Sequence, residues 1–284
     1  MDTIDCALDS LHVYPVKSCA GVRLEQALVA ETGLDLDRQW MVVDEQREML
    51  TQRDLPRMAL VQCRLRGDEV ILRAPGMLAL HLSVVAVEEP MRVRVWGEAV
   101  AAFSMGPLAA QWFSDFLGRK VRLVRFDPEQ RRLSSQRWTG AIEAENAFSD
   151  GYPLLVAGSS SLDDLNRRLR ARGSSEVSMA RFRPNLVVAG LEPYDEDHVA
   201  TLSFDTPGGP VVLRLVKPCS RCPIPNIDPS TAERGHEPGD ILASFRANAR
   251  LDGAVCFGMN AVIVEGFGLQ LQAGQAGRAR LAFQ

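Results

Sequence analysis

Lysine and net positive charge are what this 284-residue sequence most clearly lacks. Only three of its 32 basic residues are lysines, and 36 acidic residues bring the formal net charge to −4. Proteins that bind nucleic acids usually carry a basic excess, so this balance argues against that class. Codon bias is the simplest explanation of the preference for arginine, which by itself indicates no ligand.

Long apolar runs are lacking as well. No stretch approaches the roughly 18 residues that can span a bilayer, and the acidic start Met1–Asp5 does not have the basic and apolar segments of a signal peptide. Six cysteines in a chain of this length do not indicate a disulfide scaffold. We therefore expect a cytoplasmic protein with reduced thiols and with no membrane or nucleic-acid partner.

Short β-strands dominate the pattern of the first hundred or so residues. Met91–Val95 alternates strictly, and Trp96–Glu98 predicts a turn into a strand over 99–103. A second hairpin is expected over 65–72. Short strands separated by such turns are typical of a sandwich or a barrel.

Two helices are predicted from apolar residues at helical spacing. The first covers 108–117 and is ended by Gly118. The second covers 159–172, where Ser160 and Asp163 resemble a capping pair.

The polar segment 127–140 is expected to be a domain linker or a mobile loop. We place a domain boundary near residue 120, which gives domains of residues 1–120 and 121–284. The predicted fold class is mainly β with some helices (α+β), and its second half has apolar strands at 186–189, 211–216 and 261–264.

The densest chemical feature is the segment Val216–Pro225, which contains Cys219 and Cys222. Such a pair could be half of a zinc site, but the sequence has no second Cys-x-x-Cys and no paired histidines. Thioredoxin-like chemistry needs a helix here, and the two prolines that follow oppose one. Two interpretations stay open. The pair is inert, or one thiolate binds a metal, with Lys217 and Arg221 favouring the thiolate form.

Smaller polar clusters offer further donors. Lys17 and Ser18 could contact a phosphate or the carbonyl groups of a ligand, although a strand that ends in a polar turn is the simpler explanation. Asp37–Trp40 could be an ion pair that leads into a strand. Further along, Pro184 biases Arg183 toward an extended backbone.

Taken together, these segments resemble the MOSC family, which is named for the C-terminal domain of molybdenum cofactor sulfurase. The chain looks like the two-part proteins related to the mitochondrial amidoxime reducing component and its bacterial counterparts. The matching segments occur in the family's order and span nearly the whole chain: Tyr14–Ser18, Asp37–Trp40, Phe148–Pro153, Ser161–Asn166, Arg181–Asn185, Cys219–Cys222 with Asp228–Pro229, and Phe257–Asn260.

The resemblance implies an N-terminal β-barrel domain packed on a MOSC β-barrel, with a molybdenum–molybdopterin cofactor between them. By position, Cys222 would be the thiolate ligand to molybdenum, and Cys219 would be a neighbour without a direct bond. A dianionic phosphate in a partly dry cleft needs several charged or amide donors. The residues that would hold the pterin and its phosphate or complete the pocket are Lys17, Ser18, Arg38, Gly151, Tyr152, Arg183, Asn185, Ser220 and Arg221.

The function implied by the resemblance is a molybdenum-dependent oxidoreductase that reduces N-hydroxylated compounds such as hydroxylamines, amidoximes and N-hydroxylated bases. The sequence contains no iron–sulfur ligand spacing, so the electrons would come from a separate iron–sulfur or flavin protein. Pro225 and Asn226 stand where relatives commonly carry two threonines, which could alter the choice of substrate. The alternative is a carrier of the molybdenum cofactor or of sulfur with no turnover of its own.

Overall fold

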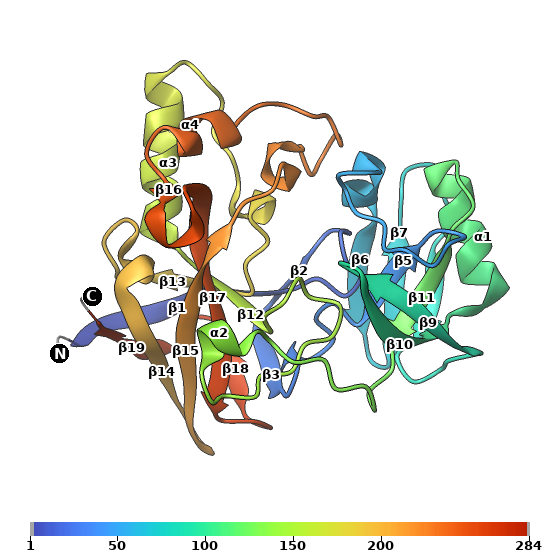
Figure 1. Cartoon of the computed structure of the whole chain (residues 1–284), viewed down its shortest axis with the longest axis horizontal. Coiled ribbons are helices and arrows are strands. Elements are labelled where there is room, and N and C mark those ends of the chain that lie inside the picture. Colours follow the sequence, from blue (N-terminus) through green and yellow to red (C-terminus); the bar gives the residue numbers. More distant parts are fainter. Residues whose placement is uncertain (1–2, 283–284) are drawn as a thin grey trace.

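Strands far outnumber helices in the computed structural model of the protein, which describes residues 3–282. Figure 1 shows two lobes side by side, with α3 (Ser159–Ala171) and α4 (Gly239–Ala243) on one and α1 (Gly106–Leu117) on the other. We call them the barrel lobe and the small lobe. The mainly β fold class with a few helices that the sequence predicts is confirmed.

The barrel lobe is built on a closed barrel of seven strands. Closure comes from the pairing of its last strand with its first, which leaves no free edge in the ring. Its core is apolar and includes Leu8, Leu202 and Phe204. The order around the barrel is β12 (Leu154–Gly158), β13 (Leu186–Ala189), β1 (Thr3–Val13), β19 (Ala276–Leu281), β14 (Val199–Thr206), β15 (Gly209–Ser220) and β17 (Ala254–Glu265), with β2 (Val22–Leu24) and β16 (Ala247–Asn248) attached at its sides.

The small lobe contains two antiparallel sheets and helix α1, which share an apolar core around Phe113 and Phe116. Its four-stranded sheet has the order β5 (Trp40–Val43), β11 (Arg122–Phe126), β10 (Glu98–Ser104) and β9 (Pro90–Val95). Its three-stranded sheet consists of β6 (Gln62–Arg66), β7 (Glu69–Arg73) and β8 (Leu80–Ser83). The shorter elements of the molecule are β3 (Gln26–Ala30), β4 (Gly33–Leu34), β18 (Gln270–Gln272), α2 (Gln136–Thr139), η1 (Pro56–Leu60), η2 (Met179–Arg181), η3 (Asp195–His198), η4 (Ile224–Asn226) and η5 (Ala249–Leu251).

The chain passes between the lobes more than once. Strand β1 precedes the small lobe in sequence but lies in the barrel between β13 and β19. Strand β11 follows residue 120 but belongs to the four-stranded sheet of the small lobe. The division into residues 1–120 and 121–284 therefore does not coincide with the two lobes, and it stays a prediction about sequence domains.

Local sequence signals locate several elements correctly. The hairpin of β9 and β10 turns at Trp96–Gly97, and α1 ends at Gly118, whose φ of 67° suits glycine. None of the helices in the described part of the chain combines the length and the apolar character that a membrane span requires.

The predicted capping pair of α3 is wrong. Gly158 is the N-cap residue, and the Ser160 hydroxyl has no partner within residues 3–282. Instead, the buried Glu196 carboxylate accepts hydrogen bonds from the Gly158 amide at 3.1 Å and from the Ser161 hydroxyl at 2.7 Å. A tertiary contact from η3 thus supplies the hydrogen-bond acceptor at the N-terminus of α3.

The segment 127–140 lies between β11 of the small lobe and β12 of the barrel lobe, so of the two expected alternatives it matches a linker, and its packing opposes a mobile loop. Arg132 is 6% exposed, and its Nη1 donates to the carbonyls of Ala147 and Ser149 at 3.0 and 2.7 Å. Its Nε pairs with Glu98 at 2.9 Å. The segment therefore ties the β9–β10 hairpin of the small lobe to the chain that enters β12.

Candidate active site

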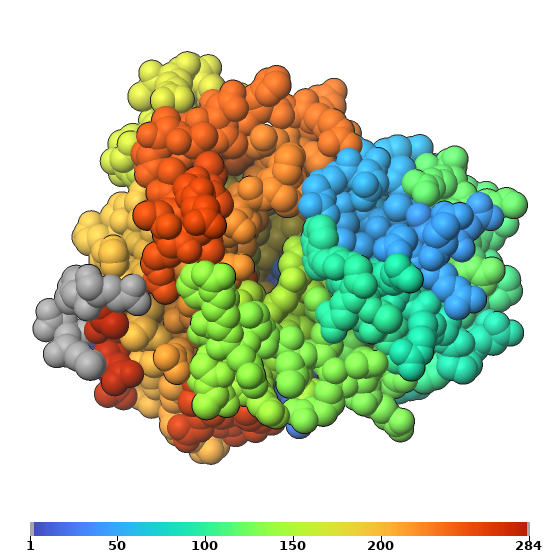
Figure 2. Space-filling model, viewed as in Figure 1, coloured from blue at the N-terminus to red at the C-terminus, as the bar shows by residue number. Residues whose placement is uncertain are grey.

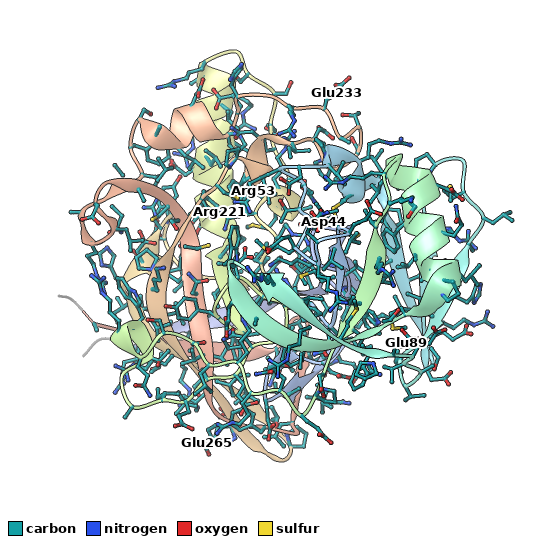
Figure 3. All side chains as sticks on the ribbon, turned by 45° about the vertical axis from the view of Figure 1, so that its right-hand side comes forward. Asp44, Arg53, Glu89, Arg221, Glu233 and Glu265 are labelled. Atoms are coloured by element: carbon teal, nitrogen blue, oxygen red, sulfur yellow. The ribbon has the colours of Figure 1, made fainter. Side chains whose placement is uncertain are left out.

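A cavity of about 580 Å³ opens between the two lobes, and Figure 2 shows the hollow near the middle of the molecule. Figure 3 shows Arg53 of the small lobe and Arg221 of the barrel lobe near this central region, whereas Glu265 lies at the periphery. All ten residues that the sequence places in a cofactor site line the cavity: Lys17, Ser18, Arg38, Gly151, Tyr152, Arg183, Asn185, Ser220, Arg221 and Cys222. Their individual roles stay predictions.

The cavity wall is strongly cationic. Among the described residues that line it, seven are lysine or arginine and one, Asp150, is a carboxylate. Five of the seven are guanidinium groups, which can bind two oxygens of a phosphate or carboxylate at once. The cavity is therefore suited to an anionic ligand. The seven cations are Lys17, Arg38, Arg53, Arg132, Arg183, Lys217 and Arg221.

Three of the predicted residues have a backbone that bulky side chains rarely adopt. The φ angles of Ser18, Arg38 and Arg183 are 66°, 49° and 59°. The expectation of an extended Arg183 is wrong, because its carbonyl accepts from Arg38 at 3.1 Å and its guanidinium donates to the Cys19 carbonyl at 2.6 Å. These contacts override the local preference set by the following proline. Strained residues of this kind gather at ligand sites.

The Tyr14 ring positions two of the arginines. The guanidinium of Arg38 lies 4.4 Å from the ring centroid, and that of Arg183 lies 4.2 Å from it. The Tyr14 hydroxyl donates to the Pro184 carbonyl at 3.1 Å, and burial raises the pKa of Tyr14 to about 12, so it stays neutral. Two positive charges are thus held against one rigid ring beside the cavity.

Asn185 orients Arg38. Its side-chain oxygen accepts from Arg38 Nη1 at 3.0 Å and from the Leu155 amide at 3.1 Å, while its Nδ2 donates to the His12 carbonyl at 3.1 Å. Arg38 Nη1 also pairs with Asp37 at 2.5 Å. The buried Asn185 side chain thus has partners for both its oxygen and its nitrogen within the protein.

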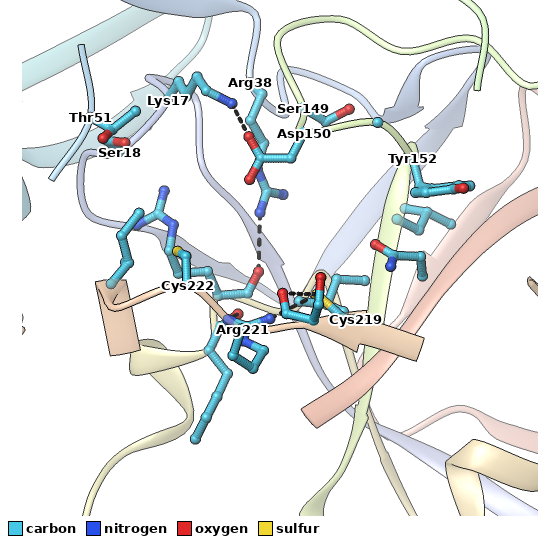
Figure 4. A pocket seen from close by; sticks show the side chains of 18 of the residues that line it. Lys17, Ser18, Arg38, Thr51, Ser149, Asp150, Tyr152, Cys219, Arg221 and Cys222 are labelled. Carbon is cyan, nitrogen blue, oxygen red and sulfur yellow. Dashed lines mark hydrogen bonds and ion pairs between the residues drawn. The ribbon is translucent and has the colours of Figure 1, made fainter. Parts of the chain in front are cut away.

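Lys17 and Asp150 form the ion pair of the cavity wall, with Nζ 2.5 Å from Oδ1 (Figure 4). Lys17 Nζ also donates to the Phe148 carbonyl at 2.8 Å. Burial lowers the pKa of Lys17, and the charge of Asp150 opposes that shift. Burial raises the pKa of Asp150, but the charge and hydrogen bond of Lys17 prevail and hold it below its ordinary value.

The two cysteines at the end of β15 have different surroundings. Arg221 Nη1 lies 3.0 Å from Cys219 Sγ, and its Nη2 donates to the Phe182 carbonyl at 2.8 Å. The thiol of Cys222 belongs to an exposed residue. Arg221 Nε is buried and has no partner within residues 3–282. Figure 4 shows Cys219, Arg221 and Cys222 facing the Lys17–Asp150 pair.

Several lining residues were not predicted as site residues. Asp150 lies inside a segment of the family pattern, so its position beside Gly151 was an available signal. The sequence pattern indicates only a turn at Trp96 and only a linker or mobile loop around Arg132. The sequence gives no local sign that these two residues reach the cavity. The polar or aromatic lining residues outside the prediction are Thr51, Arg53, Trp96, Arg132, Ser149, Asp150, Phe182, Lys217, Cys219 and Asn260.

The barrel and its cleft define a mainly β protein with an anion-accepting cavity beside an exposed thiol. No three His, Cys, Asp or Glu side chains gather as a metal site within residues 3–282. Residues 6–120 match the MOSC N-terminal beta barrel domain, and residues 143–276 match the MOSC domain.

Relatives support the same assignment. The mouse mitochondrial amidoxime-reducing component 1 is 35% identical over 246 residues, which cover 83% of this chain and 70% of the mouse protein. The human protein of the same name is 33% identical, with coverage of 83% and 71%. The molybdenum cofactor sulfurase of Arabidopsis thaliana is 29% identical over 88% of this chain and 32% of that protein. The chain therefore belongs to the MOSC family, as a distant relative of the amidoxime-reducing components.

Proposed function

We propose that this protein binds a molybdenum–molybdopterin cofactor in the cleft and reduces N-hydroxylated compounds. The observation that carries the proposal is the combination of seven cations and one exposed thiol, that of Cys222, around a single cavity. The names of the animal relatives, amidoxime-reducing components, point to the same class of substrate. A separate iron–sulfur or flavin protein would supply the electrons.

The residues present fit the anionic part of such a cofactor. Lys17, Ser18, Arg38 and Arg183 would hold the pterin and its phosphate, and each charge-assisted hydrogen bond contributes roughly 1.5–3 kcal/mol. The buried Arg221 Nε, which lacks a partner within residues 3–282, is a donor that a bound anion would satisfy. The backbone at Gly151 and Tyr152, together with Asn185 and Ser220, would complete the pocket.

Cys222 would be the protein's ligand to the metal. Its thiol is exposed at the cavity, whereas Arg221 lies within hydrogen-bond distance of the Cys219 sulfur. The bound molybdenum would supply the chemistry that removes oxygen from an N–O bond. Reduction of a hydroxylamine to an amine consumes two electrons and two protons and releases water. The protein's part is to bind, orient and admit the substrate.

A carrier of the cofactor or of transferable sulfur is the second candidate function. The exposure of Cys222 favours it, because a thiol that delivers sulfur must be reached by another protein. The similarity to molybdenum cofactor sulfurase points in the same direction.

Metal and pterin analysis of the purified protein, followed by an activity assay, separates these functions. We expect molybdenum and pterin in stoichiometric amounts, and reduction of benzamidoxime or hydroxylaminopurine when a reductase pair is supplied. Bound molybdenum with no reduction under any donor would favour the carrier. Protein that contains neither molybdenum nor pterin, even after expression with excess molybdate, would contradict both functions.

A further inference from the structure

Trp96 is an exposed aromatic residue inside the cleft. It stands at the tip of the β9–β10 hairpin, lines the cavity and is 50% exposed. Its φ is 55°, which is unusual for a bulky side chain, and Gly97 after it has a φ of 83°. A half-exposed indole on a strained backbone forfeits hydrophobic burial and conformational energy, so its position needs an explanation beyond the turn itself.

The hairpin that presents Trp96 is anchored at two points. The indole Nε1 donates to Asp150 Oδ1 at 3.2 Å, and Asp150 is itself paired with Lys17. Two residues further along, Glu98 pairs with the buried Arg132 at 2.9 Å. The indole is therefore held in one orientation before any ligand arrives, which lowers the entropic cost of binding against it.

Arg53 covers part of the indole. Its guanidinium carbon lies 4.4 Å from the ring centroid. The only side-chain hydrogen bond of Arg53 within residues 3–282 goes to the Thr51 hydroxyl at 3.3 Å, so most of its donors are available. Its carbonyl accepts from Arg234 of the barrel lobe at 2.5 Å, which fixes the loop that carries it. Both Trp96 and Arg53 line the cavity.

We propose that Trp96, backed by Arg53, is the stacking platform that selects planar N-hydroxylated substrates over small aliphatic ones. The reaction itself rests on the proposed function. An indole paired with a guanidinium binds flat, polarisable rings, since stacking requires only a π-face and Arg53 donors can reach ring nitrogens or carbonyls. The preferred substrates are therefore aryl amidoximes and N-hydroxylated heterocyclic bases.

The arrangement of the cleft agrees with this role. Trp96 comes from the small lobe and Cys222 from the barrel lobe, and both line the same cavity. The Trp96 partner Asp150 faces the Arg221–Cys222 segment in Figure 4. A ring that stacks on Trp96 can thus direct its N–O group toward the side of the cavity that carries Cys222.

The experiment compares Trp96→Ala, Trp96→Phe and the wild-type holoenzyme on two substrates, hydroxylaminopurine and N-methylhydroxylamine. We expect Trp96→Ala to lower kcat/KM for hydroxylaminopurine about ten- to a hundredfold, the equivalent of about 1–3 kcal/mol of lost stacking. The value for N-methylhydroxylamine should stay unchanged, and Trp96→Phe should recover most of the loss. Phe267→Ala is the matched control, because Phe267 is 52% exposed and does not line the cavity.

Three results would overturn the platform. An equal loss for both substrates would show that Trp96 has only a structural role. A fall of molybdenum and pterin content in Trp96→Ala would assign the indole to the cofactor instead. Finally, calorimetric titration with hydroxylaminopurine measures binding without turnover, and equal affinity of wild type and Trp96→Ala would contradict stacking. If the wild type binds this ligand through Trp96 but reduces nothing, the proposed function fails and the platform stands.

Discussion

The two sides of the cleft differ in how their polar groups are satisfied. On one side, Lys17 and Arg38 are held by short contacts to Asp150, Phe148 and Asn185. On the other, at the end of β15, Cys222 is exposed and Arg221 Nε has no partner within the described chain. The first side resembles a preformed electrostatic cradle, and the second leaves reactive groups available. A site that binds a large anion and performs chemistry at one end needs both properties.

The largest effect is expected at the reactive side. Cys222→Ser should reduce N-hydroxylated substrate turnover to the background rate, because a hydroxyl is a poor substitute for a thiolate ligand to a soft or high-valent metal. Cys219→Ser should keep most of the activity. Both variants are assayed at equal protein concentration with molybdenum content recorded. A comparable loss of turnover in the two variants would contradict the assignment of Cys222 alone as the metal ligand.

Cofactor retention is expected to be sensitive to the shape of the side chains in the cradle. Lys17→Arg keeps the charge but forces a planar guanidinium into a site where residue 17 is only 5% exposed, and overpacking of this kind costs about 1–3 kcal/mol. Molybdenum retained after dialysis should fall well below the wild-type ratio. Lys120→Arg is the control, since the Lys120 side chain is 84% exposed. Full retention in Lys17→Arg would show that charge alone suffices.

Substitution of one asparagine on each side of the cleft tests whether the side chains of the cradle contribute more to the stability of the fold. Asn185→Ala removes three side-chain hydrogen bonds and should lower the free energy of unfolding by about 2–4 kcal/mol. Asn260 makes one, from Nδ2 to the Lys217 carbonyl at 3.2 Å, so Asn260→Ala should cost about 1 kcal/mol. Urea denaturation of both variants measures the difference. A larger loss of unfolding free energy in Asn260→Ala than in Asn185→Ala would contradict the difference between the two sides.

The smallest effect concerns the ion pair. Asp150→Ala leaves Lys17 Nζ with the Phe148 carbonyl as its remaining partner. Because the Asp150 side chain is 72% exposed and its charge is screened by solvent, the loss of stability at pH 7 should stay below about 1 kcal/mol. Because the pKa of Asp150 in the fold lies below its ordinary value of 3.8, its contribution is present above pH 3.8 and is lost as the pH falls further. The melting temperatures of wild type and variant should therefore converge only at strongly acidic pH. A gap that is constant with pH would exclude the charge of Asp150 as its cause.

The sequence predicts which segments meet at the cleft better than it predicts how they are held there. The ordered motifs placed ten residues at one cavity, and alternation located strands such as β9 and β10. The errors share one cause, which is long-range contact. Arg183 departs from the bias of its proline because Cys19 and Arg38 bind it, and α3 is capped by Glu196 rather than by its own first turn. The sequence indicates only a turn at Trp96, because the residue that holds its indole at the cavity, Asp150, is far away in sequence.

The place of β1 in the barrel has a consequence for the order of folding. Thr3 pairs with Arg280, so β1 must wait for β19, which is synthesised much later, before the ring can close. Contacts between such distant parts of a chain form slowly, because the intervening loop must be ordered first. The small lobe, whose sheets need only residues up to 126, can fold while translation continues. The backbone of Lys17 is bonded to Trp40 of the small lobe, but its side-chain partners Phe148 and Asp150 lie beyond residue 126. We therefore expect the Lys17 side chain to reach its final position late, so that the nascent chain can bind the proposed cofactor only after the barrel has closed.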